Sequence, residues 1–218
     1  MASQTRINIG CGMNPTEGWL NLDNSPSLRL ASFPFVAEIL HRIGVLDNNQ
    51  FDFAGYCRSS RIRFADGAKR IPVADGCADV VYASHVVDLL DRRDIRLFLA
   101  EAHRVLRPGG TLRLVVPDLA KLVAEYQRNQ DGDRLMSNLM VCTPRARTLL
   151  QRLRLCLIGD RVHRWAYDRR SLSKLLLESG FREPIALEPG QTRINDPGPL
   201  DLRAQAEHRP LYMEALRP

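Results

Sequence analysis

The sequence predicts an α/β fold in which helices cover both faces of a doubly wound, mostly parallel sheet. Short apolar runs with the length of strands alternate with amphipathic stretches with the length of helices. The runs are largely apolar, which is typical of parallel strands buried on both faces. Glycine or a polar residue follows where each run ends. Ligands of such sheets bind outside the carboxyl ends of the strands.

The first expected strand, residues 6–9, leads into a turn bracketed by Gly10 and Gly12. Glycine adopts positive φ and has no Cβ, so the backbone of this turn can bend sharply and approach a ligand closely. Asp23 ends the next strand-like run, residues 19–23. A carboxylate in that place accepts hydrogen bonds from ribose hydroxyls. The layout predicts a site for a nucleoside-containing cofactor.

The same turn argues against a nicotinamide dinucleotide. The dinucleotide fingerprint places a third glycine three residues after the second one, and this chain has Pro15 there. Asp23 also follows Gly12 by only eleven residues, roughly half of the usual separation. A nicotinamide-dependent oxidoreductase is therefore a disfavoured alternative.

Three further strands are expected, over residues 61–65, 78–83 and 111–117. The residues at their carboxyl ends are Asp66, the pair Ser84-His85, and Asp118. Because the carboxyl ends of parallel strands meet at one edge of a sheet, we expect these side chains to gather near the glycine turn.

The helices are predicted from caps and periodicity. Asp91 is expected to cap a helix that runs to about residue 106 and is stopped by residues 107–110, and a second helix is expected over 119–128. Asp168 is expected to cap a helix that ends at Ser179. An antiparallel strand pair over 185–188 and 211–216 follows. An amphipathic helix over 33–46 either covers the cofactor or pads the core, and padding is the favoured interpretation.

The length of 218 residues suits one domain, 1–218, with an inserted helical segment over about 28–60 and a basic, lid-like segment over about 131–170. No apolar run approaches the roughly 18 residues of a membrane-spanning helix. Residues 1–6 lead into a strand rather than a signal peptide, so a cytoplasmic location is expected. The five cysteines lack metal-ligand or disulfide spacing, so no metal is expected; they are Cys11, Cys57, Cys77, Cys142 and Cys156.

The net charge of +6 is concentrated in one stretch. Residues 143–170 contain eight arginines against Asp160 and Asp168, and the rest of the chain is formally neutral. The guanidinium group suits phosphate and carboxylate, so the stretch favours an anionic acceptor or partner. The open alternative is a solvated helix face opposite an apolar stripe of leucines. The arginines considered for the anion are Arg145, Arg147, Arg152, Arg154, Arg161 and Arg164.

Short motifs follow one another along the chain. They are Ile7-Asn-Ile-Gly-Cys-Gly12, Asn14-Pro15, Gly18-Trp19, Asn21-Leu-Asp23, Asp66-Gly67, Ile71-Pro72, Asp79-Val80, Ser84-His85, Arg104-Val-Leu-Arg-Pro-Gly-Gly110 and Val116-Pro117-Asp118. In this order and spacing they resemble the class I S-adenosylmethionine-dependent methyltransferases. Within that family the chain is similar to a small branch with a compressed turn between the first two strands. The likeness covers residues 6–118 well and the remainder more loosely.

The resemblance implies a Rossmann-like fold, S-adenosylmethionine as the cofactor, and a set of contact residues. Gly10 and Gly12 would let the backbone approach the methionine part of the cofactor, and Asp23 would hold the ribose hydroxyls. Asp66 would accept from the adenine amino group, or alternatively it only forms a turn before Gly67. The full set implied for the cofactor is Gly10, Cys11, Gly12, Asn14, Asp23, Asp66, Gly67, Ser84 and His85.

The candidate base for deprotonating an acceptor hydroxyl is His85, because the ordinary pKa of imidazole lies near neutrality. His163, Tyr167 and Asp118 are the alternative candidates. Members of the family often carry Glu-His shortly after the Ser-His pair, and this chain has Asp88-Leu89 there. That departure leaves open a catalytically silent module that binds the cofactor for regulation or assembly.

The expected acceptor is a small molecule or a glycan, methylated at oxygen. If it is anionic, the candidates are a phosphosugar or nucleotide-sugar, an acyl group on an acidic carrier protein, or a lipid-linked glycan at an anionic membrane surface. Nucleic acid is disfavoured, because only Trp165 and Tyr167 interleave the arginines as stacking aromatics.

Overall fold

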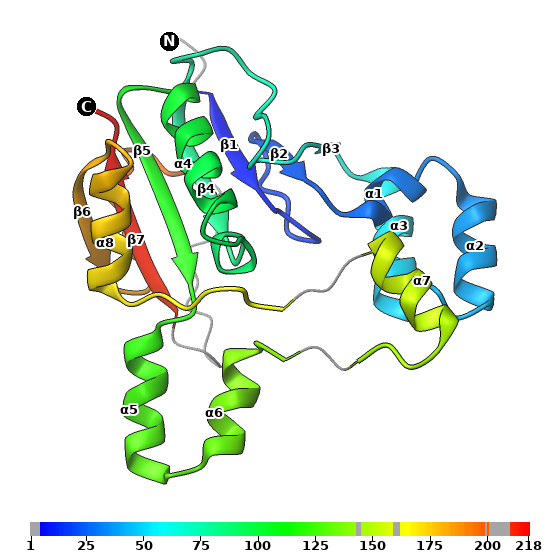
Figure 1. Ribbon diagram of the computed structural model, residues 1–218. Coiled ribbons are helices and arrows are strands. Elements are labelled where there is room, and N and C mark those ends of the chain that lie inside the picture. The colour runs from blue at the N-terminus through cyan, green and yellow to red at the C-terminus, as the bar shows by residue number, and fades with distance from the viewer. Residues whose placement is uncertain (1–4, 143–144, 159–161, 199, 201–209) are drawn as a thin grey trace.

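The computed structural model describes residues 5–142, 145–158, 162–198, 200 and 210–218. Its centre is a seven-stranded sheet of order β3-β2-β1-β4-β5-β7-β6 (Figure 1). The strands are β1 (Arg6–Ile9), β2 (Leu20–Asp23), β3 (Ile62–Phe64), β4 (Ala78–Ser84), β5 (Leu106–Val116), β6 (Arg182–Leu187) and β7 (Leu211–Leu216). Strands β1 to β5 pair in parallel, and β7 is antiparallel to both of its neighbours. The predicted fold class, with its antiparallel C-terminal pair, is confirmed.

The helices are α1 (Pro26–Leu30), α2 (Pro34–Arg42), α3 (Asn48–Ser59), α4 (Asp94–Val105), α5 (Leu119–Asn129), α6 (Gly132–Leu139), α7 (Leu149–Ile158) and α8 (Arg169–Glu178). Figure 1 shows α4 and α8 against the sheet, α5 and α6 beyond the carboxyl end of β5, and the group of α1 to α3 with α7 beyond the β3 edge. Among the described residues, no helix has the length and apolarity needed to cross a membrane.

The register of the parallel strands brings their carboxyl ends to one level. Ile9 of β1 lies opposite Leu22 of β2 on one side and Ala83 of β4 on the other. The next residue of each strand is therefore Gly10, Asp23 or Ser84. The sequence-based expectation that these residues share an edge of the sheet is confirmed.

The core is built from residues that alternate across the sheet. Val81 and Ala83 of β4 belong to the large cluster formed with α4 and α8, whereas Val80 and Tyr82 face the opposite side and join a second cluster. Helix α4 contributes one apolar face at helical spacing, consisting of Ile95, Phe98, Leu99, Ala102 and Val105. Continuous burial on both faces explains why β4 is apolar throughout.

Two element boundaries differ from the prediction. Residues 107–110 do not only stop α4; they are the first part of β5, which begins at Leu106. Gly109 has φ +75°, and Gly109 N–H donates to the Arg217 carbonyl, so the Pro-Gly-Gly sequence forms an irregular strand start. Asp91 does cap α4, because its carboxylate accepts the N–H groups of Arg93 and Asp94 at 2.8 Å each, but the helix itself begins at Asp94.

The inserted segment over about 28–60 is helical, as expected, but the helix predicted over 33–46 is shorter and does not pad the core. Three helices, α1 to α3, occupy the connection between β2 and β3, and α2 covers only part of the predicted range. Of the α2 residues only Ala37 is buried, whereas Phe35 is 73% exposed. A small separate cluster of Leu28, Phe53 and Cys57 holds α1 and α3 together. Periodicity identified an amphipathic helix, but its apolar face does not cover the sheet.

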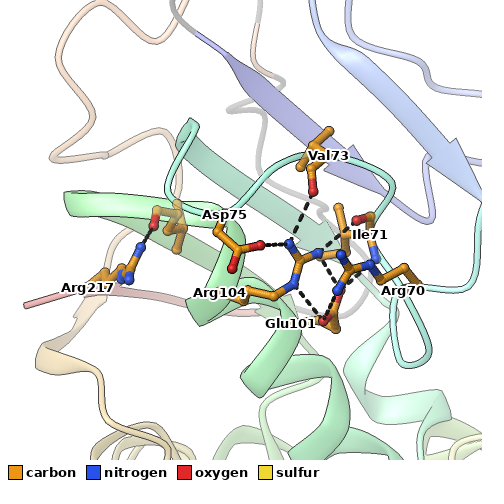
Figure 2. A network of polar contacts seen from close by, with 8 residues as sticks. Arg70, Ile71, Val73, Asp75, Glu101, Arg104 and Arg217 are labelled. Atoms are coloured by element: carbon orange, nitrogen blue, oxygen red, sulfur yellow. Dashed lines mark hydrogen bonds and ion pairs between the residues drawn. The ribbon is translucent and has the colours of Figure 1, made fainter.

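A polar network ties α4 to the connection that precedes β4 (Figure 2). The Arg104 guanidinium donates to the carbonyls of Val73 (3.1 Å) and Ile71 (2.9 Å) and to the carboxylates of Asp75 (2.5 Å) and Glu101 (2.8 Å). Glu101 in turn accepts Ile71 N–H at 2.9 Å. Hydrogen bonds from Arg104 lower the pKa of Glu101. This part of the resemblance motif therefore has a structural role.

Another charged pair lies between β5 and β7, and both of its side chains are completely buried. Arg113 Nη1 lies 2.6 Å from Glu214 Oε1, and both side chains are inaccessible to solvent. Glu214 also accepts from the Thr192 hydroxyl at 2.5 Å and from Arg193 N–H at 2.8 Å. A buried carboxylate needs such partners to offset its loss of hydration.

Candidate functional site

The glycine turn after β1 requires the conformations that the sequence predicts. Gly10 has φ +68° and Gly12 has φ +51°. A Cβ on Gly10 would lie 2.3 Å from Val86 Cγ2, so this glycine lets the turn pack against the residues that follow β4. A Cβ on Gly12 would meet nothing within 4 Å. The backbone at Gly12 therefore faces open space, as a ligand-binding turn should.

Asp23 fixes the shape of this turn from the end of β2. Its Oδ2 accepts Gly12 N–H at 3.0 Å, and its Oδ1 accepts Ser25 N–H at 2.7 Å. Each carboxylate oxygen can accept more than one hydrogen bond, so the group retains acceptor capacity for hydroxyls of a ligand. The structure thus joins the predicted glycine turn and the predicted acid into one unit.

Cys11 lies inside the turn with its thiol buried. Burial, reinforced by the nearby charge of Asp23, raises the pKa of Cys11 to about 12. The thiol is therefore protonated at neutral pH, and a protonated thiol is a poor nucleophile. Asn14 is on the surface beyond it, and its N–H donates to the Cys11 carbonyl at 2.9 Å. Cys11, Cys57, Cys77 and Cys142 are free thiols; the Cys156 side chain lies outside the described residues.

Asp66 and Gly67 form a tight turn after β3. The Asp66 carboxylate accepts Ala68 N–H at 3.1 Å and lies 3.2 Å from Lys69 Nζ. A Cβ on Gly67 would lie 3.1 Å from Ile9 Cγ2, so glycine allows this turn to pack on β1. These contacts give both residues a structural role, and the Asp66 carboxylate remains partly exposed.

Ser84 ends β4, and His85 takes an unusual backbone conformation. His85 has φ 52°, a left-handed conformation that is uncommon for residues other than glycine and that occurs frequently at functional sites. Its N–H donates to the Val115 carbonyl at 2.9 Å, which extends the pairing with β5. Because Val86 contacts Gly10, His85 is held beside the glycine turn.

Asp88 connects two of the candidate histidines. It lies in a single 3₁₀ turn (Val87–Leu89), and its side chain is 1% exposed. Its Oδ2 lies 3.1 Å from His163 Nε2 and 3.9 Å from His85 Nδ1. Apart from the two histidines at these distances, neither carboxylate oxygen of Asp88 has a hydrogen-bond partner among the described residues. Burial raises the pKa of Asp88, and the two histidines act in the opposite direction.

Tyr167 and Asp118 lie beside this cluster. Their backbones form a parallel bridge in which Leu119 N–H donates to the Tyr167 carbonyl at 2.8 Å. The side chain of Tyr167 is in the core, and burial raises its pKa, which disfavours the phenolate that a base would need. The Asp118 carboxylate caps α5 through Ala120 N–H at 3.0 Å and lies 3.6 Å from Lys121 Nζ. His85 and His163 are therefore the candidates with the geometry of a base.

The structure adds residues that sequence reasoning did not place in the site. The sequence predicts Asp88 only as a departure from the family pattern, although its spacing of three residues from His85 indicates that the two side chains can meet. Arg92 lies 4.8 Å from the Trp165 ring centroid, and its charge acts against the burial that raises the pKa of Tyr167. No sequence pattern links Arg92 to Trp165, because the two lie far apart along the chain.

The arginine-rich segment divides between the site and a separate helix. Arg145, Arg147 and Arg152 are exposed at and around α7, which lies beyond the β3 edge with α1 to α3 (Figure 1). Arg154 is paired with Asp47 at 2.5 Å. Arg164 lies near Asp91 and Asp88, and Arg161 lies outside the described residues. The arginines are therefore not one cluster.

The apolar stripe expected to oppose these arginines is largely exposed where the structure describes it. Leu149 is 83% and Leu150 is 39% exposed. The side chains of Leu153, Cys156 and Leu157 lie outside the described residues. The described part of α7 therefore does not present a buried apolar stripe.

Part of the chain is similar to known proteins. Residues 46–114 match the family model of a methyltransferase domain.

Two curated relatives are named malonyl-[acyl-carrier protein] O-methyltransferase. The one from Hahella chejuensis is 32% identical over 112 residues, which is 50% of this chain and 35% of the relative. The one from Pectobacterium atrosepticum is 30% identical over 108 residues, 45% of this chain and 42% of the relative. The chain thus spans less than half of the length of either relative.

Solved structures show the same fold. An S-adenosylmethionine-dependent methyltransferase from Thermotoga maritima, described as a possible histamine N-methyltransferase, superposes with a TM-score of 0.52 at 15% identity and covers 100% of this chain and 84% of that one. One from Methanosarcina mazei gives a TM-score of 0.52 at 14% identity, with coverages of 100% and 94%. Residues 46–114 thus match a methyltransferase domain, and the chain has the same fold as these S-adenosylmethionine-dependent methyltransferases.

Proposed function

We propose that the chain transfers a methyl group from S-adenosylmethionine to a hydroxyl oxygen of a small-molecule or glycan acceptor that carries an anionic group. The observation that supports this proposal is the packing of Val86, the residue after His85, against Gly10 of the glycine turn. A base at that point can reach an acceptor that approaches the cofactor. The two histidines beside Asp88 can accept a proton from a hydroxyl group, and they therefore support oxygen as the atom that is methylated.

The residues present fit the cofactor. The open space at Gly12 and the residual acceptor capacity of Asp23 suit the methionine and ribose parts, respectively. The exposed part of the Asp66 carboxylate suits the adenine amino group. The bound cofactor supplies a methyl group already activated on a positively charged sulfur. The protonated Cys11 thiol does not compete as a nucleophile there, because its pKa is raised to about 12.

The protein then has two tasks at the acceptor. It must align the acceptor oxygen, which by itself can contribute several kcal/mol to catalysis. It must also take the hydroxyl proton, and a positioned base contributes about 10²- to 10⁴-fold. His85 is the proposed base. Arg92 and Arg164, near the same cluster, are the cations proposed to face the anionic group of the acceptor.

A carboxylate on an acidic carrier protein is the second candidate acceptor. It is favoured by the names of the two relatives and by the exposed arginines around α7. A carboxylate is already ionised at neutral pH and needs no base. The two candidates therefore differ in whether turnover depends on His85.

Binding and transfer can be tested in two steps. Calorimetry with purified protein should detect S-adenosylmethionine and its demethylated product, and the absence of heat for both with an intact fold would end the proposal. Labelled methyl groups should then be transferred into pools of phosphosugars or into malonyl groups on an acidic carrier. Mild alkali releases methanol from a methyl ester but not from a methyl ether, so alkali-stable label supports the hydroxyl and alkali-labile label supports the carboxylate.

A further inference from the structure

The strongest unassigned feature is the buried carboxylate of Asp88. Its backbone carbonyl accepts the N–H groups of Arg164 at 2.7 Å and Trp165 at 3.2 Å. These bonds attach the end of the basic segment to the turn after β4 and bring in His163 from 75 residues away in sequence. The carboxylate is thereby enclosed between His163 and His85, with no solvent to hydrate it.

The hydrogen bonds of His163 determine where its protons lie. His163 Nδ1 is 2.9 Å from the Leu139 carbonyl oxygen, and a carbonyl only accepts, so Nδ1 carries a hydrogen. Nε2 then faces Asp88 Oδ2 at 3.1 Å. If neither atom carried a proton, two lone pairs would face each other in a buried site, at an electrostatic cost. One of these two atoms therefore carries a proton.

We propose that Asp88 and His163 form a proton-sharing pair that positions His85 and compensates the charge that His85 gains as the base. The inference rests on the proposed function. When a hydroxyl proton moves to His85, the shared proton lies on His163 Nε2 and Asp88 is the anion facing the new imidazolium. When His85 is neutral, the shared proton can return to Asp88 Oδ2. The pair has zero net charge in both states, and no proton is lost or gained by it.

The surrounding groups suit this role. The charges of Asp88 and of Arg92, in the loop before α4, both act on the pKa of the buried Tyr167 hydroxyl. Arg164 lies near Asp91, and its N–H donates to the Asp88 carbonyl. His163 also brings an imidazole next to Asp88, the residue before Leu89, which stands where the resemblance pattern has a histidine. Asp88 and His163 are positioning residues, because neither is required to touch the acceptor.

The decisive variant is Asp88→Asn. The asparagine amide can donate to His163 Nε2 and keeps the shape of the buried side chain, but it cannot become an anion. We expect kcat to fall by about 10- to 100-fold, less than for loss of the base itself, with the affinity for S-adenosylmethionine unchanged. The acidic limb of the kcat/KM pH profile should move. His163→Gln should have the same effect, and the double variant should be no worse than the more severe single variant.

Asp91→Asn is the matched control. It removes a carboxylate from the same connection, and asparagine retains the capping function, so kcat and the pH profile should stay unchanged. Asp88→Glu should restore part of the activity if the negative charge is what matters. A pH profile of Asp88→Asn identical to that of the wild type, or additive losses in the double variant, would overturn the inference.

A second measurement does not depend on turnover. Long-range ¹H–¹⁵N spectra should show His163 with a protonated Nδ1 in the wild type and, in Asp88→Asn, as the neutral Nδ1–H tautomer. A neutral Nε2–H tautomer in the wild type would contradict the pair. If the wild type binds no S-adenosylmethionine, the proposed function fails while these spectra still test the pair. If the wild type methylates and the variants behave like it, only the pair fails.

Discussion

Two buried carboxylates in this protein have opposite surroundings. Glu214 is inaccessible to solvent and receives an ion pair from Arg113, a hydroxyl from Thr192 and a backbone N–H from Arg193. Asp88 is almost as buried, but among the described residues its carboxylate has only the two histidines beside it, at 3.1 and 3.9 Å. A fully satisfied buried charge holds a fold together, whereas an incompletely satisfied one that lies beside a ligand turn is available for chemistry.

The largest expected effect tests the structural half of this comparison. Glu214→Gln leaves the Arg113 guanidinium buried without a counter-charge, which should cost about 3–5 kcal/mol of unfolding free energy. Urea unfolding should show this loss, and Arg113→Met in the same chain should recover part of it. An equal loss in Asp88→Asn would mean that the two carboxylates do not differ in kind.

The functional half of the comparison is tested by His85→Asn. Turnover on a hydroxyl acceptor should fall by about 100-fold or more, while the calorimetric affinity for S-adenosylmethionine and the unfolding free energy stay close to those of the wild type. Unchanged turnover would remove His85 as the base and would leave the carboxylate acceptor as the better candidate.

Gly10→Ala tests whether the glycine turn depends on its contact with the residues after β4. A Cβ would lie 2.3 Å from Val86 Cγ2 at a backbone φ of +68°, so we expect a loss of about 1–3 kcal/mol in unfolding free energy and weaker cofactor binding. Val86→Ala in the same chain should relieve the clash but not the unfavourable φ. Gly12→Ala, which meets no atom, should lose less stability.

Neutralising the exposed arginines tests a region outside the comparison. Changing Arg145, Arg147 and Arg152 to glutamine should raise KM for an anionic acceptor or carrier by a few fold, on the order of 1 kcal/mol or less, and the effect should diminish at high salt. Adding a change at Arg154 breaks the pair with Asp47 and serves to separate stability from binding. No change in acceptor affinity would remove α7 from the acceptor site.

The smallest effect concerns Glu101, a second satisfied carboxylate. Its pKa is lowered from the ordinary value of 4.5, chiefly by the hydrogen bond from Arg104. The stabilisation is therefore present above about pH 4.5 and is lost as the pH falls through the lowered pKa. Unfolding measured from pH 7 to pH 3 should show a shallower decline for Glu101→Gln than for the wild type. Parallel declines would mean that this network contributes nothing measurable.

Most of the sheet could be predicted from the sequence because its signals are local. The apolar run of β4, the helix over 119–128 and the cap at Asp168 each depend on neighbouring residues, and all are confirmed. The edge shared by Gly10, Asp23 and Ser84 follows from parallel pairing alone. The irregular start of β5 was missed because Pro-Gly-Gly usually ends elements, and here Arg217 pairs with it.

The candidate site was only partly predictable, for the same reason. The enclosure of Asp88 by His163 joins segments that no periodicity connects, and burial of a carboxylate cannot be read from its neighbours in sequence. The exposure of Phe35 on α2 was missed because an amphipathic pattern reports that one face is apolar but not what covers that face.

The position of β7 affects how the protein is made. This strand is the last of the seven in sequence, yet it lies between β5 and β6. While the chain leaves the ribosome, one edge of β5 is unpaired and β6 has no partner strand until residues 211–216 emerge. Over the same interval the Arg113 side chain lacks its ion-pair partner Glu214. Unpaired edges of this kind favour aggregation. Nascent chains stalled before residue 211 should therefore depend on chaperones more strongly than released ones.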